Sequence, residues 1–269
     1  MCRLLGVVSA TPAVIPELLG AELERFAALS SVHCDGWGIA YWDDAGNLVV
    51  DKAPEPATGS AAFRAAVGDA RTRAAILHLR KASVGMPNLP DNTHPFTTGR
   101  VAFAHNGYFS PLGPVDDLLG DPPARPCAGG TDSERYFRLV LAGMQDEDPV
   151  AALARAATRI AAVARVVSLN ALMLTEDALY ALAYYDEDVI AAQDGDAGSY
   201  VLRFRPGRDA FVVASSGWEQ PTPDWEVLGN GAILEVRRED LSTTVHRADV
   251  QAGPASGGPG SGPAGGSAR

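Results

Sequence analysis

The chain opens with MCRLLGVVSA, residues 1–10, and this stretch decides what the rest of the fold must accommodate. Residues 3–10 form a short apolar run, which predicts a buried β-strand that starts directly after Cys2. A small second residue permits removal of the initiator methionine, so Cys2 could become the mature N-terminus. The α-amino group of such a cysteine titrates near pH 8 and could serve as the base for its own thiol. The alternative is a small apolar residue at a frayed chain end.

Apolar periodicity and turn residues predict the other elements. Asp43 to Asn47 would close a hairpin, Thr131 or Asp132 would cap one helix, and Asp148 would cap another. The predicted helices span 16–30, 61–70, 131–144 and 148–167; the predicted strands span 3–10, the hairpin 36–53, 73–82, 100–109, 169–177, 178–188, 200–206, 210–216 and 231–239.

The order of these elements indicates the fold class. Strands come in antiparallel-looking pairs, and helices come in blocks between them, which favours α+β over alternating βαβ units. Two stacked sheets with helices outside would fit this order. We expect one domain over residues 1–251 and a disordered tail over 252–269, where glycine, proline and serine dominate.

Composition excludes several classes of function. The formal net charge is -11, which disfavours binding to a phosphate backbone, so we expect no nucleic-acid partner. No apolar stretch is long enough for a bilayer span, so we expect no membrane partner. Three cysteines without regular spacing, Cys2, Cys34 and Cys127, do not form a disulfide framework and fit a reducing cytoplasm. Pro12, Pro16 and Glu17 argue against a signal peptide.

Three further segments carry groups that could act on an amide. FAHNG ends an apolar strand with Asn106 and Gly107, whose N–H groups could form an oxyanion hole, although Asn-Gly is also a strong hairpin-turn signal. HLRKASVG places Arg80 at a strand end, either as a carboxylate clamp or as a surface ion-pair partner. GGTDSE places Asp132 at a helix start, either as a cap or as a partner for an ammonium group.

Taken together, these segments resemble the class II glutamine amidotransferases, which are N-terminal-nucleophile (Ntn) hydrolases. The resemblance rests on MCRLLG, DGWGIAY, HLRKASVG, NTHPF, FAHNG and GTDSE, in this order over residues 1–140, and more loosely through VVASS to about residue 240. It implies a four-layer αββα sandwich of two antiparallel sheets. It further implies the small stand-alone branch of the family, without an acceptor domain.

The resemblance also implies roles for individual residues. Cys2 would be the nucleophile, and Asn106 with the Gly107 N–H would form the oxyanion hole. Arg80 would bind the α-carboxylate of glutamine and Asp132 its α-ammonium. Two further residues would bind the substrate or support its site. Ser83 has a hydroxyl where the family's motif after the arginine also has one, and His94 of NTHPF would support the glutamine loop.

The reaction implied is hydrolysis of the glutamine side-chain amide to glutamate and ammonia, without a metal or organic cofactor. The sequence departs from the family where Val84 replaces a histidine, so the substrate loop could close differently. ASVGMP also resembles the γ-glutamyl hydrolase of ergothioneine biosynthesis, so a γ-glutamyl amide is the alternative substrate. An acceptor or synthetase subunit and a second copy of the chain are the candidate protein partners.

Two readings from other classes compete with the enzyme. A non-catalytic glutamine-binding regulatory module would keep the pocket without turnover, and the presence of Cys2, Asn106 and Gly107 argues against it. A metal protein would need CxxC or HxxxH spacing, which the sequence lacks.

The resemblance further implies a structural role for HCDGWGIAYW, residues 33–42, which would open a core strand beneath the nucleophile. There His33 and Cys34 would take no part in the chemistry, Cys34 would be buried or half-buried, and Asp35 would hold a loop.

Overall fold

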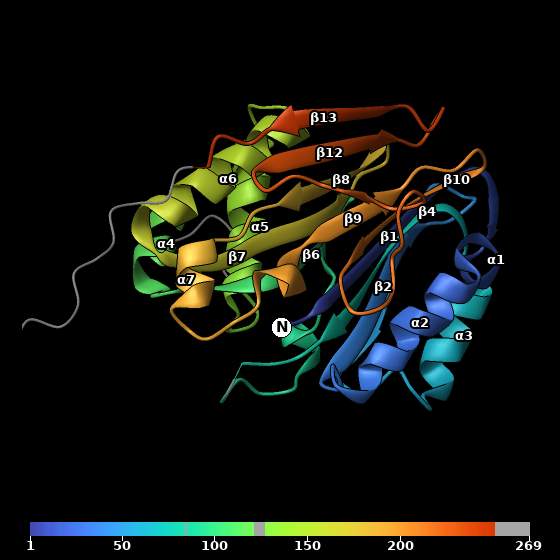
Figure 1. Cartoon of the computed structure of the whole chain (residues 1–269), viewed down its shortest axis with the longest axis horizontal. Coiled ribbons are helices and arrows are strands. Elements are labelled where there is room, and N and C mark those ends of the chain that lie inside the picture. The colour runs from blue at the N-terminus through green and yellow to red at the C-terminus, as the bar shows by residue number, and fades with distance from the viewer. Residues whose placement is uncertain (84, 121–126, 251–269) are drawn as a thin grey trace, which may run out of the picture.

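The computed structural model describes residues 1–83, 85–120 and 127–250 of the chain (Figure 1). The predicted tail at 252–269 and the departure at Val84 lie outside these residues. Within them, two antiparallel sheets form the centre of the molecule. The first sheet has the order β11-β9-β10-β1-β4-β2-β3, and the second has the order β13-β12-β8-β7-β6-β5.

The strands of the first sheet are β1 (Arg3–Val14), β2 (Gly36–Trp42), β3 (Leu48–Ala53), β4 (Arg71–Arg80), β9 (Leu202–Arg205), β10 (Ala210–Ser215) and β11 (Glu226–Val227). Those of the second are β5 (Phe96–Thr98), β6 (Val101–Ser110), β7 (Arg165–Leu174), β8 (Ala178–Ala183), β12 (Ala232–Arg237) and β13 (Thr243–Arg247). The helices are α1 (Ile15–Leu19), α2 (Ala21–Ala28), α3 (Ala61–Asp69), α4 (Gly113–Leu119), α5 (Asp132–Gly143), α6 (Pro149–Val163) and α7 (Glu187–Ala191).

Three apolar layers hold these elements together. Alternate residues of each strand point to opposite faces, so β1 sends Leu4 and Val8 between the two sheets and Leu5 and Val7 toward α1–α3. A third apolar layer joins the outer face of the second sheet to α4–α6. Figure 1 shows α1–α3 on one flank and α4–α6 on the other, with both sheets between them. The fold is therefore the αββα sandwich that the sequence predicts.

The predicted elements are present, with some corrections. The helix predicted over 16–30 is divided into α1 and α2 at Gly20, whose positive φ of 53° ends the first helix. β1 is longer than predicted and continues to Val14 after an irregularity in its pairing with β4. The elements that the sequence reading missed are short or lie in segments rich in turn residues: α4, α7, β5, β11 and β13. Thr131 caps α5, and Asp132 is the first helical residue.

Candidate active site

Cys2 lies at the start of β1, a strand flanked by β10 and β4 in the first sheet. β1 and β4 are antiparallel, with Arg3 opposite Leu79, so the beginning of β1 meets the end of β4. The backbone N–H of Lys81 points to the Cys2 sulfur at 3.5 Å. The neighbouring Leu4 N–H donates to Ser215 Oγ at 3.0 Å, which fixes the strand start against β10. Cys2 is half-buried at this sheet end.

The surroundings of the Cys2 thiol set its protonation. Burial raises the pKa of Cys2, and the negative charge of Asp132 adds to this shift. The backbone contact with Lys81, the amino terminus and Arg80 act in the opposite direction but do not cancel it. The thiol form is therefore favoured with Met1 in place, and attack on an amide would need a base close to the sulfur.

Arg80 ends β4 and is almost fully buried, at 3% exposure. Its Nη1 donates to Asn88 Oδ1 at 2.6 Å, and its Nη2 donates to the Pro87 carbonyl oxygen at 3.4 Å. The guanidinium fork is thus engaged by the loop that follows β4. A substrate carboxylate would have to replace these contacts to bind both nitrogens.

Asp35 also holds the loop that follows β4 through hydrogen bonds. Its carboxylate accepts from the Ala82 N–H at 2.8 Å and from Asn88 Nδ2 at 3.2 Å, and its own N–H donates to the Arg80 carbonyl oxygen. This confirms the predicted loop-holding role of Asp35. Ser83 lies exposed within the loop. Cys34 is exposed, which corrects its predicted burial.

Asn106 and Gly107 lie inside β6, in continuous register with β7, so the Asn-Gly pair is not a hairpin turn. Asn106 is fully buried, and neither its side-chain nitrogen nor its side-chain oxygen has a hydrogen-bond partner. A buried amide without hydrogen-bond partners is destabilising, so it points to a functional role for this side chain. A Cβ at Gly107 would lie 1.9 Å from the Ser168 carbonyl oxygen, so only glycine fits there.

Asp132 lies beside the end of β6. Its Oδ2 accepts from the Phe109 N–H at 3.2 Å, and its Oδ1 accepts from the Ser133 N–H at 2.8 Å. Its charge acts on the thiol of Cys2, as does that of Arg80. Cys2 and Arg80 therefore meet at one end of the first sheet, and the charge of Asp132, beside β6 of the second sheet, acts on the Cys2 thiol.

His94 is buried, like Arg80 and Asn106. Its ring is buried, packs 4.1 Å from the His78 ring between centroids, and has no partner on either nitrogen. Burial lowers its pKa well below the usual value, so the ring is neutral. The carbonyl oxygen of His94 would lie 2.1 Å from a Cβ at Gly38, so this glycine of DGWG lets the NTHPF segment cross β2.

Sequence reasoning missed three residues that shape the site. Asn88 holds Arg80, as described above. Asn92 donates to the Pro87 carbonyl oxygen and accepts from the Gly130 N–H, so it joins the loop after β4 to the segment before α5. His33 contacts the carbonyl oxygen of Met1 through Nδ1 at 2.7 Å. These three residues lie close in sequence to the motifs DGWG and NTHPF, and this was the only signal that could have indicated them, because contacts between loops leave no periodic pattern.

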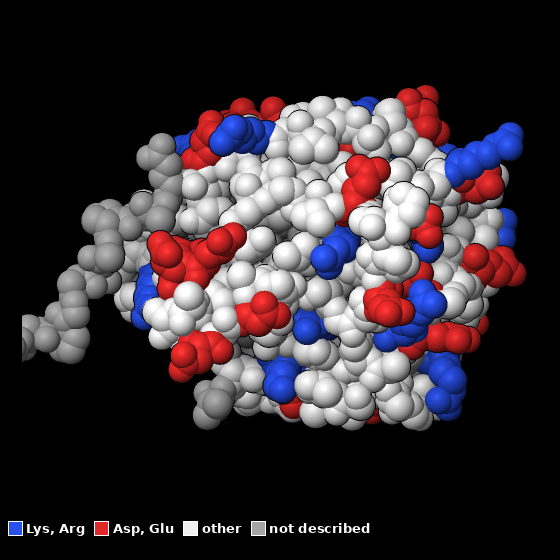
Figure 2. Space-filling model, viewed as in Figure 1, with Lys and Arg blue, Asp and Glu red and all other residues white. Residues whose placement is uncertain are grey.

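The charge on the visible face is mixed. Figure 2 shows acidic and basic side chains scattered over the surface, with basic groups exposed close to where Figure 1 places the N-terminus. Among the described residues, no group of three or more histidine, cysteine, aspartate or glutamate side chains converges as metal ligands would. In the same part of the chain, no helix has the length and apolarity needed to cross a membrane.

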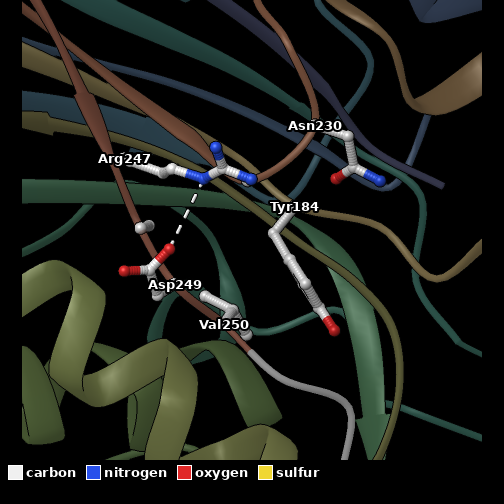
Figure 3. Close-up of a pocket in the computed structure, with 7 residues that line it drawn as sticks. Tyr184, Asn230, Arg247, Asp249 and Val250 are labelled. Atoms are coloured by element: carbon white, nitrogen blue, oxygen red, sulfur yellow. Dashed lines mark ion pairs between the residues drawn. The ribbon is translucent and has the colours of Figure 1, made fainter.

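A hollow of about 370 Å³ lies where β8 and β13 end and β12 begins (Figure 3). Arg247 and Asp249 face each other there at 3.4 Å, and both are well exposed. The hollow contains no nucleophile and none of the predicted site residues. Its lining consists of Tyr184, Asn230, Gly231, Arg247, Ala248, Asp249 and Val250.

The two antiparallel sheets with helices on both outer faces make an Ntn-hydrolase fold, and comparison with known proteins agrees with this fold. The model of the class II glutamine amidotransferase family matches residues 1–256, so the chain belongs to this family of enzymes.

Curated relatives include two proteins named γ-glutamyl-hercynylcysteine sulfoxide hydrolase. The one from Mycolicibacterium smegmatis is 27% identical over 79% of this chain and 82% of its own length. The one from Mycobacterium tuberculosis is 32% identical over 45% of this chain, and the match spans 57% of that protein. Among solved structures, a glutamine aminotransferase class-II domain protein from Silicibacter pomeroyi matches with a TM-score of 0.64 and 21% identity, over 91% of this chain and 99% of its own. That likeness concerns the fold.

Proposed function

We propose that the protein hydrolyses the side-chain amide of glutamine or of a γ-glutamyl compound, with Cys2 as the nucleophile once Met1 is removed. The observation that carries this proposal is the meeting of Cys2 and Arg80 at one end of the first sheet. The charge of Asp132 acts on the Cys2 thiol, and β6 of the facing sheet contains the unpartnered amide of Asn106. Each of these groups matches one part of an α-amino acid amide: its reacting carbonyl, its carboxylate and its ammonium.

The reaction follows from these groups. The free α-amine of Cys2 takes the thiol proton, and the sulfur attacks the δ-carbonyl carbon. The resulting oxyanion is stabilised by Asn106 Nδ2 and the Gly107 N–H, which act mainly in the transition state. The amine then passes its proton to the leaving nitrogen, the C–N bond breaks and a thioester remains on Cys2. Water, deprotonated by the same amine, releases glutamate.

Binding of the amino acid end requires a rearrangement of the loop. The guanidinium of Arg80 is now occupied by Asn88 and by the Pro87 carbonyl oxygen, both neutral acceptors. A carboxylate forms stronger, charge-assisted bonds in a bidentate arrangement, so it can displace them. Asn106 is fully buried, so the atoms that cover it must also shift before an oxyanion can reach it. We propose that movement of the segment after Arg80 accompanies substrate binding.

Glutamine is the first candidate substrate, because every proposed contact is made to the glutamyl part. A larger γ-glutamyl amide is the second candidate, and two observations favour it. Both mycobacterial relatives are named as hydrolases of such an amide. Moreover, of the six large hydrophobic residues exposed in the described part of the chain, three lie next to site residues in sequence and remain after Met1 is removed: Val32, Leu89 and Tyr108. These exposed apolar side chains could contact a bulky leaving amine.

The deciding experiment compares kcat/KM for glutamine with kcat/KM for γ-glutamyl amides of bulky amines. A preference of about a hundredfold for a bulky amide, about 2.7 kcal/mol in transition-state binding, would replace glutamine as the substrate. Uncharged amides that lack the α-amino acid end should be poor substrates in either case. Saturable glutamine binding without turnover of any of these compounds would instead show a non-catalytic regulatory module.

Partners and location are part of the proposal. Ammonia could be released to water or passed to an acceptor or synthetase subunit, and the chain could form a homodimer. The three cysteines are unpaired, which supports the proposed cytoplasmic location. Co-purification from the native cell would reveal a stable acceptor subunit, and light scattering would reveal a dimer.

A further inference from the structure

We propose that His33 is a positioning residue for the catalytic base: it holds the α-amino group that Cys2 acquires when Met1 is removed. The inference rests on the proposed function, because it requires Cys2 to be the mature N-terminus. It differs from the prediction made from the sequence, in which His33 takes no part in the chemistry.

The geometry starts from the contact between His33 and Met1. His33 Nδ1 lies 2.7 Å from the Met1 carbonyl oxygen. A carbonyl oxygen lies about 2.3 Å from the nitrogen of its own peptide unit, so His33 Nδ1 is no more than about 5 Å from the Cys2 nitrogen. Removal of Met1 takes away the oxygen and turns that nitrogen into a free amine. The ring then reaches the amine after a small shift, or through one water molecule in place of the lost oxygen.

The backbone around His33 is held independently of Met1. The His33 N–H donates to the Leu29 carbonyl oxygen, and the Asp35 N–H donates to that of Arg80, so the segment is bonded on both sides of the ring. His33 as a whole is only 5% exposed. The backbone of His33 therefore stays in place when Met1 leaves, and the ring remains next to the new amine.

The charges around His33 keep its ring neutral. Burial lowers the pKa of His33 to about 4, and the nearby cations Arg3, the amino terminus and Lys81 act in the same direction. The contact with the Met1 carbonyl oxygen opposes the shift without reversing it. A neutral imidazole has one nitrogen free to accept. With its proton on Nε2, the ring would accept an N–H of the Cys2 amine and leave the amine lone pair free for the thiol proton.

This arrangement predicts which step depends on His33. The S–H bond of Cys2 breaks while an N–H bond forms on the amine, and this transfer requires the amine to be held close to the sulfur. Glutamyl binding depends on Arg80 and Asp132 instead. Loss of His33 should therefore slow acylation and leave substrate binding nearly unchanged.

The test compares His33→Ala with His33→Asn, whose side-chain amide can supply an acceptor near the place of Nδ1. The matched control is His246→Asn, since His246 lies on β13 and contacts Glu235. Intact mass first establishes whether Met1 is absent from each variant. The readouts are kcat and KM for the better substrate, and the rate of inactivation by 6-diazo-5-oxo-norleucine.

We expect His33→Ala to lower kcat and the inactivation rate at least about tenfold, with KM changed less than about twofold. His33→Asn should recover most of the loss, and the control should behave as wild type. The inference is overturned by unchanged kcat in His33→Ala, by equal losses in both His33 variants, or by retention of Met1 in them. If Cys2→Ala keeps activity, the proposed function itself fails; if Cys2→Ala is inactive while His33→Ala is normal, only the role of His33 fails.

Discussion

The Cys2 sulfur lies 3.5 Å from the backbone nitrogen of Lys81, a residue 79 positions away that directly follows Arg80. This contact exists because β1 and β4 are antiparallel neighbours, so the start of one strand meets the end of the other. The proposed nucleophile and the proposed carboxylate clamp are thereby fixed to the same sheet end. Mutations that separate the roles of the two residues are therefore informative.

Replacing Asn106 should impair turnover more than binding. Asn106→Ala removes an oxyanion donor that acts mainly in the transition state, and such a loss costs on the order of 100- to 1000-fold in rate. We expect kcat to fall by this factor and KM to change little. Asn230→Ala is the matched control, because Asn230 lines the hollow beside β12 and β13 and none of the proposed site residues does. A fall in kcat below about tenfold would remove Asn106 from the oxyanion hole.

Replacing Arg80 should show the reverse pattern. Arg80→Lys keeps the positive charge but loses the planar fork, so KM for the amino acid substrate should rise about tenfold or more while kcat changes little. Arg71→Lys, at an exposed ion pair with Asp44, is the control. A selective loss of kcat would assign Arg80 to the chemical step instead.

Gly38 should tolerate no side chain. A Cβ at this position would lie 2.1 Å from the His94 carbonyl oxygen and 2.9 Å from Pro95 Cδ. We expect Gly38→Ala to lower the free energy of unfolding by about 3 kcal/mol, measured by urea denaturation. Gly229→Ala provides the matched control, because no atom lies within 4 Å of its Cβ position. Equal stability of the two variants would contradict the close crossing of NTHPF over β2.

Acid should destabilise the fold through its buried histidines. Burial lowers the pKa of His78 to about 3 and that of His33 to about 4. Between the unfolded value of about 6.5 and these values, only the unfolded chain takes up the proton, so stability is full above pH 6.5 and falls as the pH decreases. Each such group contributes a slope of about 1.4 kcal/mol per pH unit.

The measurement is urea unfolding at pH 7.5, 6 and 5. His78→Gln cannot ionise and can still donate to the His105 carbonyl oxygen, which His78 Nε2 contacts at 3.2 Å. Its stability should therefore depend less on pH than that of wild type. His246→Gln, on a partly exposed residue, should keep the wild-type slope. The same slope in all three proteins would show that His78 is not held neutral by burial.

The sequence predicted the layers of this fold well, because strand alternation and helix periodicity follow directly from which faces are buried. The break at Gly20 was missed, since a glycine inside a helical pattern does not by itself show a change of direction. The strand β13 was missed because its residues Thr243–Arg247 are largely exposed and carry little apolar signal.

The site was predictable where a motif carries chemistry and unpredictable where it depends on contacts between loops. The positions of Cys2, Arg80 and Asp132 came from motifs at strand and helix ends, and in the structure Cys2 and Arg80 meet at one end of the first sheet. The pairing of Arg80 with Asn88, and of His33 with Met1, joins segments that no periodicity relates. Such contacts arise only after the strands have set the positions of the loops.

Covalent labelling with 6-diazo-5-oxo-norleucine, followed by peptide mapping and intact mass, tests the central claim most directly. Cys34 is exposed and Cys127 is half-buried, so both serve as internal controls for non-specific alkylation. The account predicts a chain that lacks Met1, a single label on Cys2, and loss of activity in proportion to labelling. Label on Cys34 or Cys127 with Cys2 unmodified, or full activity in a chain that retains Met1, would contradict it.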